Sequence, residues 1–238
     1  MSVDVTKSPE KISGMFDAIA GNYDFLNHLL SAGIDRRWRK RAIRALRLTG
    51  RERILDLCTG TADLAIAART ASPPAHSVVG VDFAGAMLGI GHGKLRQQRL
   101  DDRITLIRGD ASRIPLASDS VDAITIGFGI RNVLDTAAAC AEMFRTLHRG
   151  GRLVILEFAI PTTPIISHGY RFYFNRVLPL IGTLVSRHNA AYGYLPASVG
   201  AFASPDEFVT ILRHAGFTDI QASPLTFGIV YLYTARRP

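Results

Sequence analysis

The amino-acid sequence predicts an α/β fold in which a mostly parallel sheet carries helices on both faces. Within residues 54–157, short apolar runs alternate with segments of helical spacing, as parallel strands with crossover helices do. Two further apolar runs, 217–222 and 229–235, are separated by Pro224 and Gly228. Because this connection is too short for a crossover helix, we expect the last two strands to be antiparallel.

Composition favours one domain spanning residues 1–238, because 47% of the residues are apolar and can bury a full core. The net charge of +8 arises largely from a run of basic residues within 36–53. Such a run suits an anionic membrane surface, a nucleic acid or simply a solvated helix face. Since no aromatic-interleaved RNA motif accompanies it, we expect no nucleic-acid partner.

The cysteine, histidine and hydropathy patterns bear on the cellular compartment, on metal binding and on membrane insertion. Cys58 and Cys140 lack CxxC spacing and are expected to be packing residues in a reducing compartment, and the histidines show no metal-ligand spacing. Residues 1–13 are unlike a signal peptide, and no apolar run approaches the ~20 residues needed to span a bilayer. The sequence therefore predicts a cytoplasmic protein without a metal, at most peripheral at the inner face of the membrane, and leaves a homodimer open.

The N-terminal segment 11–48 is expected to form a helical cover over the site. Residues 1–10 should be frayed, and apolar spacing within 15–31 predicts two helices. Tyr23, Asp24 and Asn27 are polar residues in this apolar setting. On the residues alone, a helix cap explains them better than a binding site.

The central elements follow from apolar periodicity and glycine punctuation. Glycines within 85–100 should loosen that helix, and 149–151 should end the helix that starts at residue 135. Ser204 begins a later helix with a capping box, and Gly216 ends it. The expected strands are 54–57, 77–82, 104–108, 121–128 and 152–157, and the expected helices include 63–69, 85–100 and 135–147.

The alternation of strands and helices lapses within 161–203, which is rich in aromatic and apolar residues. An insertion that follows a strand at the carboxyl edge of a sheet can cover the site and form an apolar pocket. The alternative is that the insertion only packs against the body of the domain.

The stretch 54–63 predicts a nucleotide site, because an apolar strand there runs into a glycine turn that opens a helix. Asp82 ends the next strand, where an acidic residue grips a ribose hydroxyl in doubly wound folds. Ala62 and Ala65 replace two of the glycines that a dinucleotide needs, and Asp56 flanks the turn. A cationic nucleotide such as a sulfonium suits this turn better than a phosphate does.

At this point the chain resembles the class I S-adenosylmethionine methyltransferases, which have a Rossmann-like, mostly parallel seven-stranded sheet with a C-terminal antiparallel hairpin. Four further stretches, 23–38, 128–132, 149–158 and 192–198, are similar to the demethylmenaquinone and 2-methoxy-6-polyprenyl-1,4-benzoquinol C-methyltransferases. The likeness extends over residues 16–231. It implies S-adenosylmethionine-dependent C-methylation of a polyprenyl hydroquinone in menaquinone or ubiquinone biosynthesis.

The resemblance implies a set of cofactor contacts. Thr61 and its neighbours should contact the methionine moiety, Asp82 the ribose, and Asp110 with Ala111 the adenine. A carboxylate can accept a hydrogen bond from the exocyclic amine of adenine. Gly127 stands where the family often has a serine and can offer only backbone. The full predicted set is Asp56, Gly60, Thr61, Asp82, Phe83, Met87, Asp110, Ala111 and Gly127.

For the reaction, the ring carbon becomes nucleophilic when an adjacent hydroxyl ionises. By resemblance, Arg131 is assigned to stabilising the phenolate and Asn132 to orienting the ring hydroxyl. The alternative is that Arg131 makes a structural ion pair and Asn132 caps the next helix. Asp24 and Glu157 are the candidate proton acceptors.

Three further residues, Tyr23, Asn27 and Tyr192, are assigned to binding the quinol, and Tyr192 is also a weaker candidate for the proton acceptor. Two other functions stay open: methylation of another lipophilic small molecule, and non-catalytic binding of a nucleotide or RNA.

Overall fold

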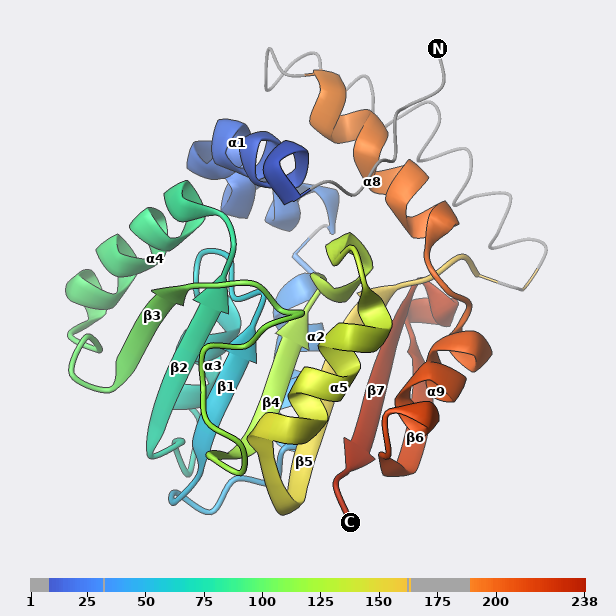
Figure 1. Ribbon diagram of the computed structural model, residues 1–238. Coiled ribbons are helices and arrows are strands. Elements are labelled where there is room, and N and C mark those ends of the chain that lie inside the picture. Colours follow the sequence, from blue (N-terminus) through green and yellow to red (C-terminus); the bar gives the residue numbers. More distant parts are fainter. Residues whose placement is uncertain (1–8, 32, 162, 164–188) are drawn as a thin grey trace.

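The computed structural model describes residues 9–31, 33–161, 163 and 189–238, which form one seven-stranded sheet with helices on both faces (Figure 1). The strand order is β3-β2-β1-β4-β5-β7-β6. The first five strands pair in parallel, and β7 is antiparallel to both β5 and β6. The predicted α/β class and antiparallel C-terminal pair are confirmed. The strands are β1 (Arg53–Leu57), β2 (Ser77–Asp82), β3 (Ile104–Arg108), β4 (Val121–Gly127), β5 (Leu147–Phe158), β6 (Thr218–Leu225) and β7 (Val230–Arg236).

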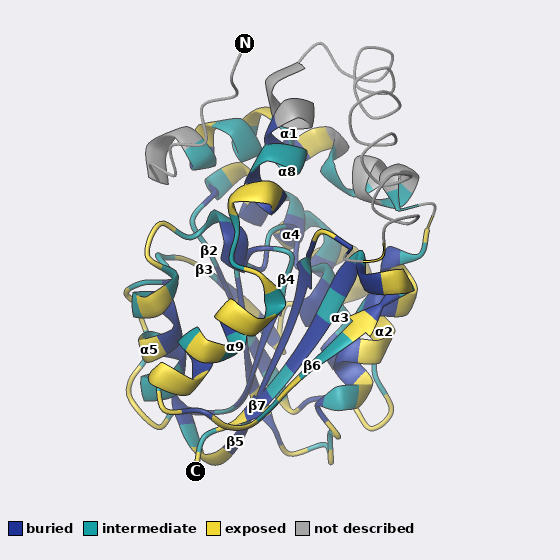
Figure 2. Ribbon diagram, turned by 90° about the vertical axis from the view of Figure 1, so that its right-hand side faces the viewer, coloured by how far each residue is buried: buried dark blue, intermediate teal, exposed yellow. Residues whose placement is uncertain are grey.

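Two apolar cores lie on opposite faces of the sheet, because strand residues alternate between the faces. One core lies under α2 (Asp35–Ala45), α3 (Asp63–Arg69) and α4 (Gly85–Gln98), and the other under α5 (Thr136–Thr146) and α9 (Pro205–His214). Figure 2 shows the dark buried strands enclosed by helices whose outer sides are exposed.

Above the carboxyl ends of the parallel strands lie α1 (Pro9–Leu30) and α8 (Asn189–Ala201) (Figure 1). The prediction of two helices within 15–31 is wrong, because α1 is a single helix that continues through Gly14 and Gly21. The rest of the predicted insertion, 162 and 164–188, lies outside the described residues.

The β4–β5 region differs from the prediction that 149–151 ends a helix. The helix ends at Thr146 and β5 begins at once, with a register shift in its pairing to β4. A Cβ added at Gly151 would approach Leu147 Cγ to 2.6 Å, so the chain folds closely on itself there. The glycines therefore accommodate a bulge inside β5 instead of a helix stop.

At the C-terminal pair, Pro224 lies inside β6 and not in the connection between the two strands, where it was expected. Because β6 is the edge strand, a residue without an N–H is tolerated there. The predicted capping box at Ser204 is confirmed: its side chain accepts from Glu207 N, and the Glu207 carboxylate accepts from Ser204 N.

Candidate active site

The turn after β1 brings backbone N–H groups to the carboxyl edge of the sheet. Cys58, Gly60 and Ala62 all have positive φ, at 55°, 55° and 68°. This left-handed path is favourable for glycine and strained for the other two residues. It directs Gly60 N toward β2, where it donates to Asp82 Oδ2 at 2.8 Å.

Asp82 is fixed by backbone donors on both oxygens, because its Oδ1 accepts from Ala84 N at 2.8 Å. Burial raises the pKa of Asp82, and the hydrogen bonds from Ala84 and Gly60 offset only part of that effect. Each carboxylate oxygen can accept more than one hydrogen bond. Asp82 therefore presents an oriented acceptor at the edge where a ribose is expected.

A cavity of about 970 Å³, including space open to solvent at its mouth, lies beside Asp82 between the strand ends and α1. Among the described residues that line it are three carboxylates, Asp82, Asp110 and Asp135, and no Lys, Arg or His. In a protein with a net charge of +8, this acidic lining favours a neutral or cationic ligand over an anionic one.

Most of the predicted cofactor residues line this cavity: Gly60, Asp82, Phe83, Met87, Asp110, Ala111 and Gly127. Asp56 does not belong to the lining. Its carboxylate is buried, where Thr59 Oγ1 donates at 2.5 Å and Thr125 Oγ1 at 2.7 Å. Burial raises the pKa of Asp56 to about 6, although these hydroxyl donors lower it.

Thr61 also lies outside the lining and belongs to an ionic cluster that the sequence did not predict. Lys94 Nζ donates to Thr61 Oγ1 at 2.8 Å and pairs with Asp24 at 2.5 Å and Asp63 at 2.6 Å. Arg39 adds a second contact to Asp63 at 3.2 Å. Asp24, a predicted proton acceptor, is therefore paired with a lysine outside the cavity lining.

Arg131 is 5% exposed and pairs with the fully buried Glu157, with 2.7 Å between Arg131 Nη1 and Glu157 Oε1. The guanidinium also donates to Phe128 O and, at 3.4 Å, to Ser198 Oγ. Burial acts to lower the pKa of Arg131, but Glu157, Tyr23 and Tyr194 together more than offset this, so the pKa is raised. Neither partner of the pair lines the cavity, so the ion-pair alternative describes the contacts of Arg131.

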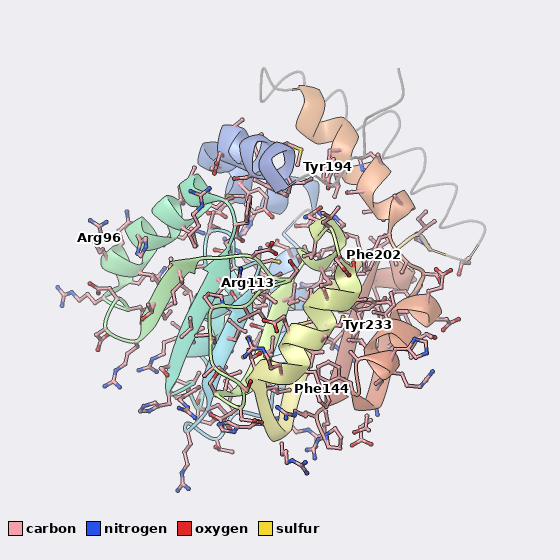
Figure 3. All side chains as sticks on the ribbon, viewed as in Figure 1. Arg96, Arg113, Phe144, Tyr194, Phe202 and Tyr233 are labelled. Atoms are coloured by element: carbon pink, nitrogen blue, oxygen red, sulfur yellow. The ribbon has the colours of Figure 1, made fainter. Side chains whose placement is uncertain are left out.

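Asn132 lies in the 3₁₀ turn Ile130–Asn132 and lines the cavity, as does Tyr23. The Asn132 Oδ1 accepts from Tyr194 Oη of α8 at 3.1 Å. Figure 3 shows Tyr194 between α8 and the sheet edge. The cap alternative for Asn132 is wrong, because the side chain of Asp135 caps α5. The side chains of Asn27 and Tyr192, also predicted for the substrate, lie outside the described residues.

Solved structures with the same fold include a methyltransferase paired with the Trm112 activator from Haloferax volcanii. It is 18% identical with a TM-score of 0.67 and covers 94% of this chain and 97% of its own. The [4+2]-cyclase SpnF is 16% identical with a TM-score of 0.68 and covers 97% and 96%. Since the second of these proteins is a cyclase, the shared fold alone does not decide the chemistry.

Sequence comparison is more specific. The family model described as the ubiE/COQ5 methyltransferase family matches residues 4–237. The ubiquinone/menaquinone biosynthesis C-methyltransferase UbiE of Geotalea daltonii is 45% identical, over 98% of this chain and 99% of that protein. The demethylmenaquinone methyltransferase of Bacteroides fragilis is 39% identical, over 97% and 94%. This protein therefore belongs to the ubiE/COQ5 methyltransferase family.

Proposed function

We propose that this methyltransferase transfers a methyl group from S-adenosylmethionine to a ring carbon of a polyprenyl hydroquinone, a step of menaquinone or ubiquinone biosynthesis. The relatives named above support the reaction and the substrate class. The observation that carries the cofactor assignment is the acidic cavity without a basic side chain among its described lining residues. A sulfonium nucleoside is the cationic ligand that this lining suits.

The residues present fit such a cofactor. Asp82 would accept from the ribose hydroxyls, since it lines the cavity and each of its oxygens can accept a further hydrogen bond. Asp110, whose Oδ1 accepts from Ser112 N and Oγ at 2.8 Å, would meet the adenine amine. Phe83 and Met87 would pack against the adenosine. Gly127, which lines the cavity, would offer only its backbone to the methionine moiety.

When bound, the cofactor supplies the methyl group of its sulfonium. The rest of the cofactor is the leaving group, a neutral thioether that needs no acid assistance. The task of the protein is then to align the ring with this methyl group and to stabilise the phenolate. A phenol with a pKa near 10 costs about 4 kcal/mol to ionise at pH 7. Groups that donate to the ring oxygen lower that cost.

Asn132 is the best-supported contact to the ring hydroxyl, because it lines the cavity and Tyr194 fixes its amide. Arg131 donates its backbone N–H to Glu157 at 3.1 Å as well as its guanidinium. We assign this doubly bonded pair to holding the turn that carries Asn132. If Arg131 also stabilises the phenolate, directly or through a water, its guanidinium must interact with the phenolate and with Glu157 at the same time.

The contacts of the two predicted proton acceptors weaken their support. Asp24 contacts Lys94 and Glu157 contacts Arg131, so each carboxylate is already engaged in an ion pair. The proton released from the ring would more readily pass to water in the cavity than to either of these ion pairs.

Turnover tests this proposal. Purified protein with S-adenosylmethionine should methylate demethylmenaquinol, a polyprenyl benzoquinol or both in the reduced form, and should leave the oxidised quinones unreacted. Mass spectrometry of the product would locate the methyl group on a ring carbon. An O-methylated product, or equal rates with the oxidised quinones, would overturn the mechanism. Methylation only of other lipophilic molecules would overturn the substrate class.

A membrane surface is a further part of the proposal, because a long isoprenoid tail stays in the bilayer. No helix in the described part of the chain is long and apolar enough to cross a membrane. On α2, Arg36, Arg37, Lys40, Arg41 and Arg44 are exposed, and each could contribute ~1 kcal/mol on anionic lipid. Flotation with anionic liposomes should weaken with salt, whereas equal binding to neutral liposomes would contradict it.

A further inference from the structure

The helix α1 forms one wall of the cavity and lies along α4. Phe16 and Tyr23 of α1 and Met87 of α4 all line the cavity, and Figure 1 shows α1 above the carboxyl ends of the strands beside α4. Ala20 and Ala84 are buried in the seam between the two helices. The seam is small, so apolar packing alone holds this wall weakly.

Polar contacts fasten α1 at both ends of the seam. Near its start, Asp17 Oδ1 accepts from Ala86 N, in the first turn of α4, at 2.9 Å. Seven positions later along α1, Asp24 pairs with Lys94, eight positions after Ala86. The two helices therefore run alongside each other in register, and Lys94 is the cationic end of this attachment.

Lys94 joins three segments with a single ammonium. Its three donors match three acceptors: Asp24 on α1, Asp63 at the start of α3 and the Thr61 hydroxyl in the turn after β1. The Thr61 hydroxyl itself donates to Asp24 Oδ1 at 2.6 Å. The turn that supports the predicted cofactor contacts is thus bonded directly to the wall helix.

The charges in the cluster explain why the lysine is decisive. Asp24 and Asp63 both contact the same Nζ, so without it two carboxylates would face each other. Arg39 compensates Asp63, whereas Asp24 depends on Lys94. Loss of the ammonium would therefore repel α1 from α3 and leave the Thr61 hydroxyl without its donor.

We propose that Lys94 is a positioning residue that holds α1 against the cofactor turn and so closes the cofactor cavity. This inference rests on the proposed function for the identity of the ligand, although the attachment of α1 can be tested without any ligand. Lys94 touches neither the reacting atoms nor the cavity. It acts through Asp24 and Thr61.

The matched pair of variants is Lys94→Gln and Arg96→Gln. Both residues lie on α4 and both substitutions remove one positive charge, but Arg96 is exposed and points away from α1 (Figure 3). In Lys94→Gln without cofactor, amide hydrogen exchange in α1 should become faster, while Arg96→Gln should match the wild type. The Kd for S-adenosylmethionine should rise about tenfold or more, through faster dissociation, with kcat at saturation changed less than the Kd.

A second variant separates positioning from a general loss of stability. Adding Asp24→Asn to Lys94→Gln removes the uncompensated carboxylate, so the double variant should bind S-adenosylmethionine more tightly than Lys94→Gln alone. Lys94→Arg should retain part of the affinity. Exchange in α1 that is the same in Lys94→Gln and Arg96→Gln would overturn the attachment. Wild-type protein that fails to bind S-adenosylmethionine would instead overturn the proposed function.

Discussion

The two ends of β1 place buried carboxylates in opposite electrostatic surroundings. Glu52 precedes the strand and is 5% exposed, and Asp56 lies near its carboxyl end and is 1% exposed. Burial alone would raise the pKa of both carboxylates. At Glu52, hydrogen bonds from Thr49 and pairing with Arg152 outweigh burial and lower the pKa to about 2, whereas at Asp56 burial prevails and raises the pKa to about 6.

Donor supply accounts for the difference. Glu52 accepts from the N–H groups of Thr49, Gly50 and Arg51 and pairs with Arg152 at 3.0 Å. Asp56 has two hydroxyl donors and lies within the field of Asp82, which also raises its pKa. The amino end of the sheet is built for stability, and the carboxyl end retains an electrostatic cost of the kind found at functional sites.

The largest effect is expected at the buried charge pair of the carboxyl end, Arg131 with Glu157. Arg131→Ala would leave Glu157 buried without a partner, so unfolding free energy should fall by about 3 to 5 kcal/mol. Urea denaturation at pH 7 measures this. Arg131→Met combined with Glu157→Gln should recover most of the loss. A loss below about 1 kcal/mol would show that the pair is not tightly held.

The same variant tests the role of the turn in catalysis. Where Arg131→Ala is still folded, as at low temperature, it should keep its affinity for S-adenosylmethionine, because the pair lies outside the cavity lining. Its kcat should fall on the order of 10² to 10⁴. If Arg131 stabilises the phenolate, part of the rate should return at higher pH. If it only holds Asn132 in place, the loss should not depend on pH.

At the amino end, Glu52→Gln should lower the unfolding free energy at pH 7 by about 3 kcal/mol, the equivalent of the lowered pKa. A lowered pKa contributes stability that is present above the unfolded value of 4.5 and is lost as pH falls toward about 2. The wild type and the variant should therefore converge in acid. Cofactor affinity should be unchanged, and a large change in affinity would contradict the division between the two ends.

Asp82→Ala should have the opposite profile to Glu52→Gln. Loss of hydrogen bonds to a charged group should weaken S-adenosylmethionine binding by roughly 1.5 to 3 kcal/mol, or about 10- to 150-fold. Because the pKa of Asp82 is raised whereas that of Glu52 is lowered, removing Asp82 should cost less stability at pH 7 than Glu52→Gln does, although Gly60 N and Ala84 N lose their acceptor. Calorimetry gives the affinity, and Asp101→Ala, at an exposed acidic residue, is the control. Unchanged affinity in folded Asp82→Ala would remove the ribose assignment.

The local sequence pattern predicted the strands and turns that carry these carboxylates. Apolar runs predicted β1 and β2, and the strand-end position predicted Asp82, because parallel strands bring their carboxyl ends together. The Lys94 cluster was not predicted, since it depends on the register of α1 against α4, which no local spacing encodes. The Arg131 contact to Ser198 likewise joins a strand end to a helix far along the chain.

The sharpest test of sign is the pH dependence from Asp56. The folded protein retains the Asp56 proton up to a pKa of about 6, whereas the unfolded chain loses it near 3.8. The folded state therefore binds more protons between these values, and stability falls as pH rises through that window, by at most about 1.4 kcal/mol per pH unit.

Asp56→Asn cannot titrate, so the difference in unfolding free energy between wild type and variant isolates this slope. That difference should decrease from about pH 4 to pH 6 and be constant above pH 7, opposite in direction to the Glu52→Gln comparison. Chemical denaturation across this range measures it. A bound sulfonium would favour the ionised carboxylate and lower its pKa, so saturating cofactor should flatten the slope. A slope of the same sign as that of Glu52 would contradict the contrast between the two ends of β1.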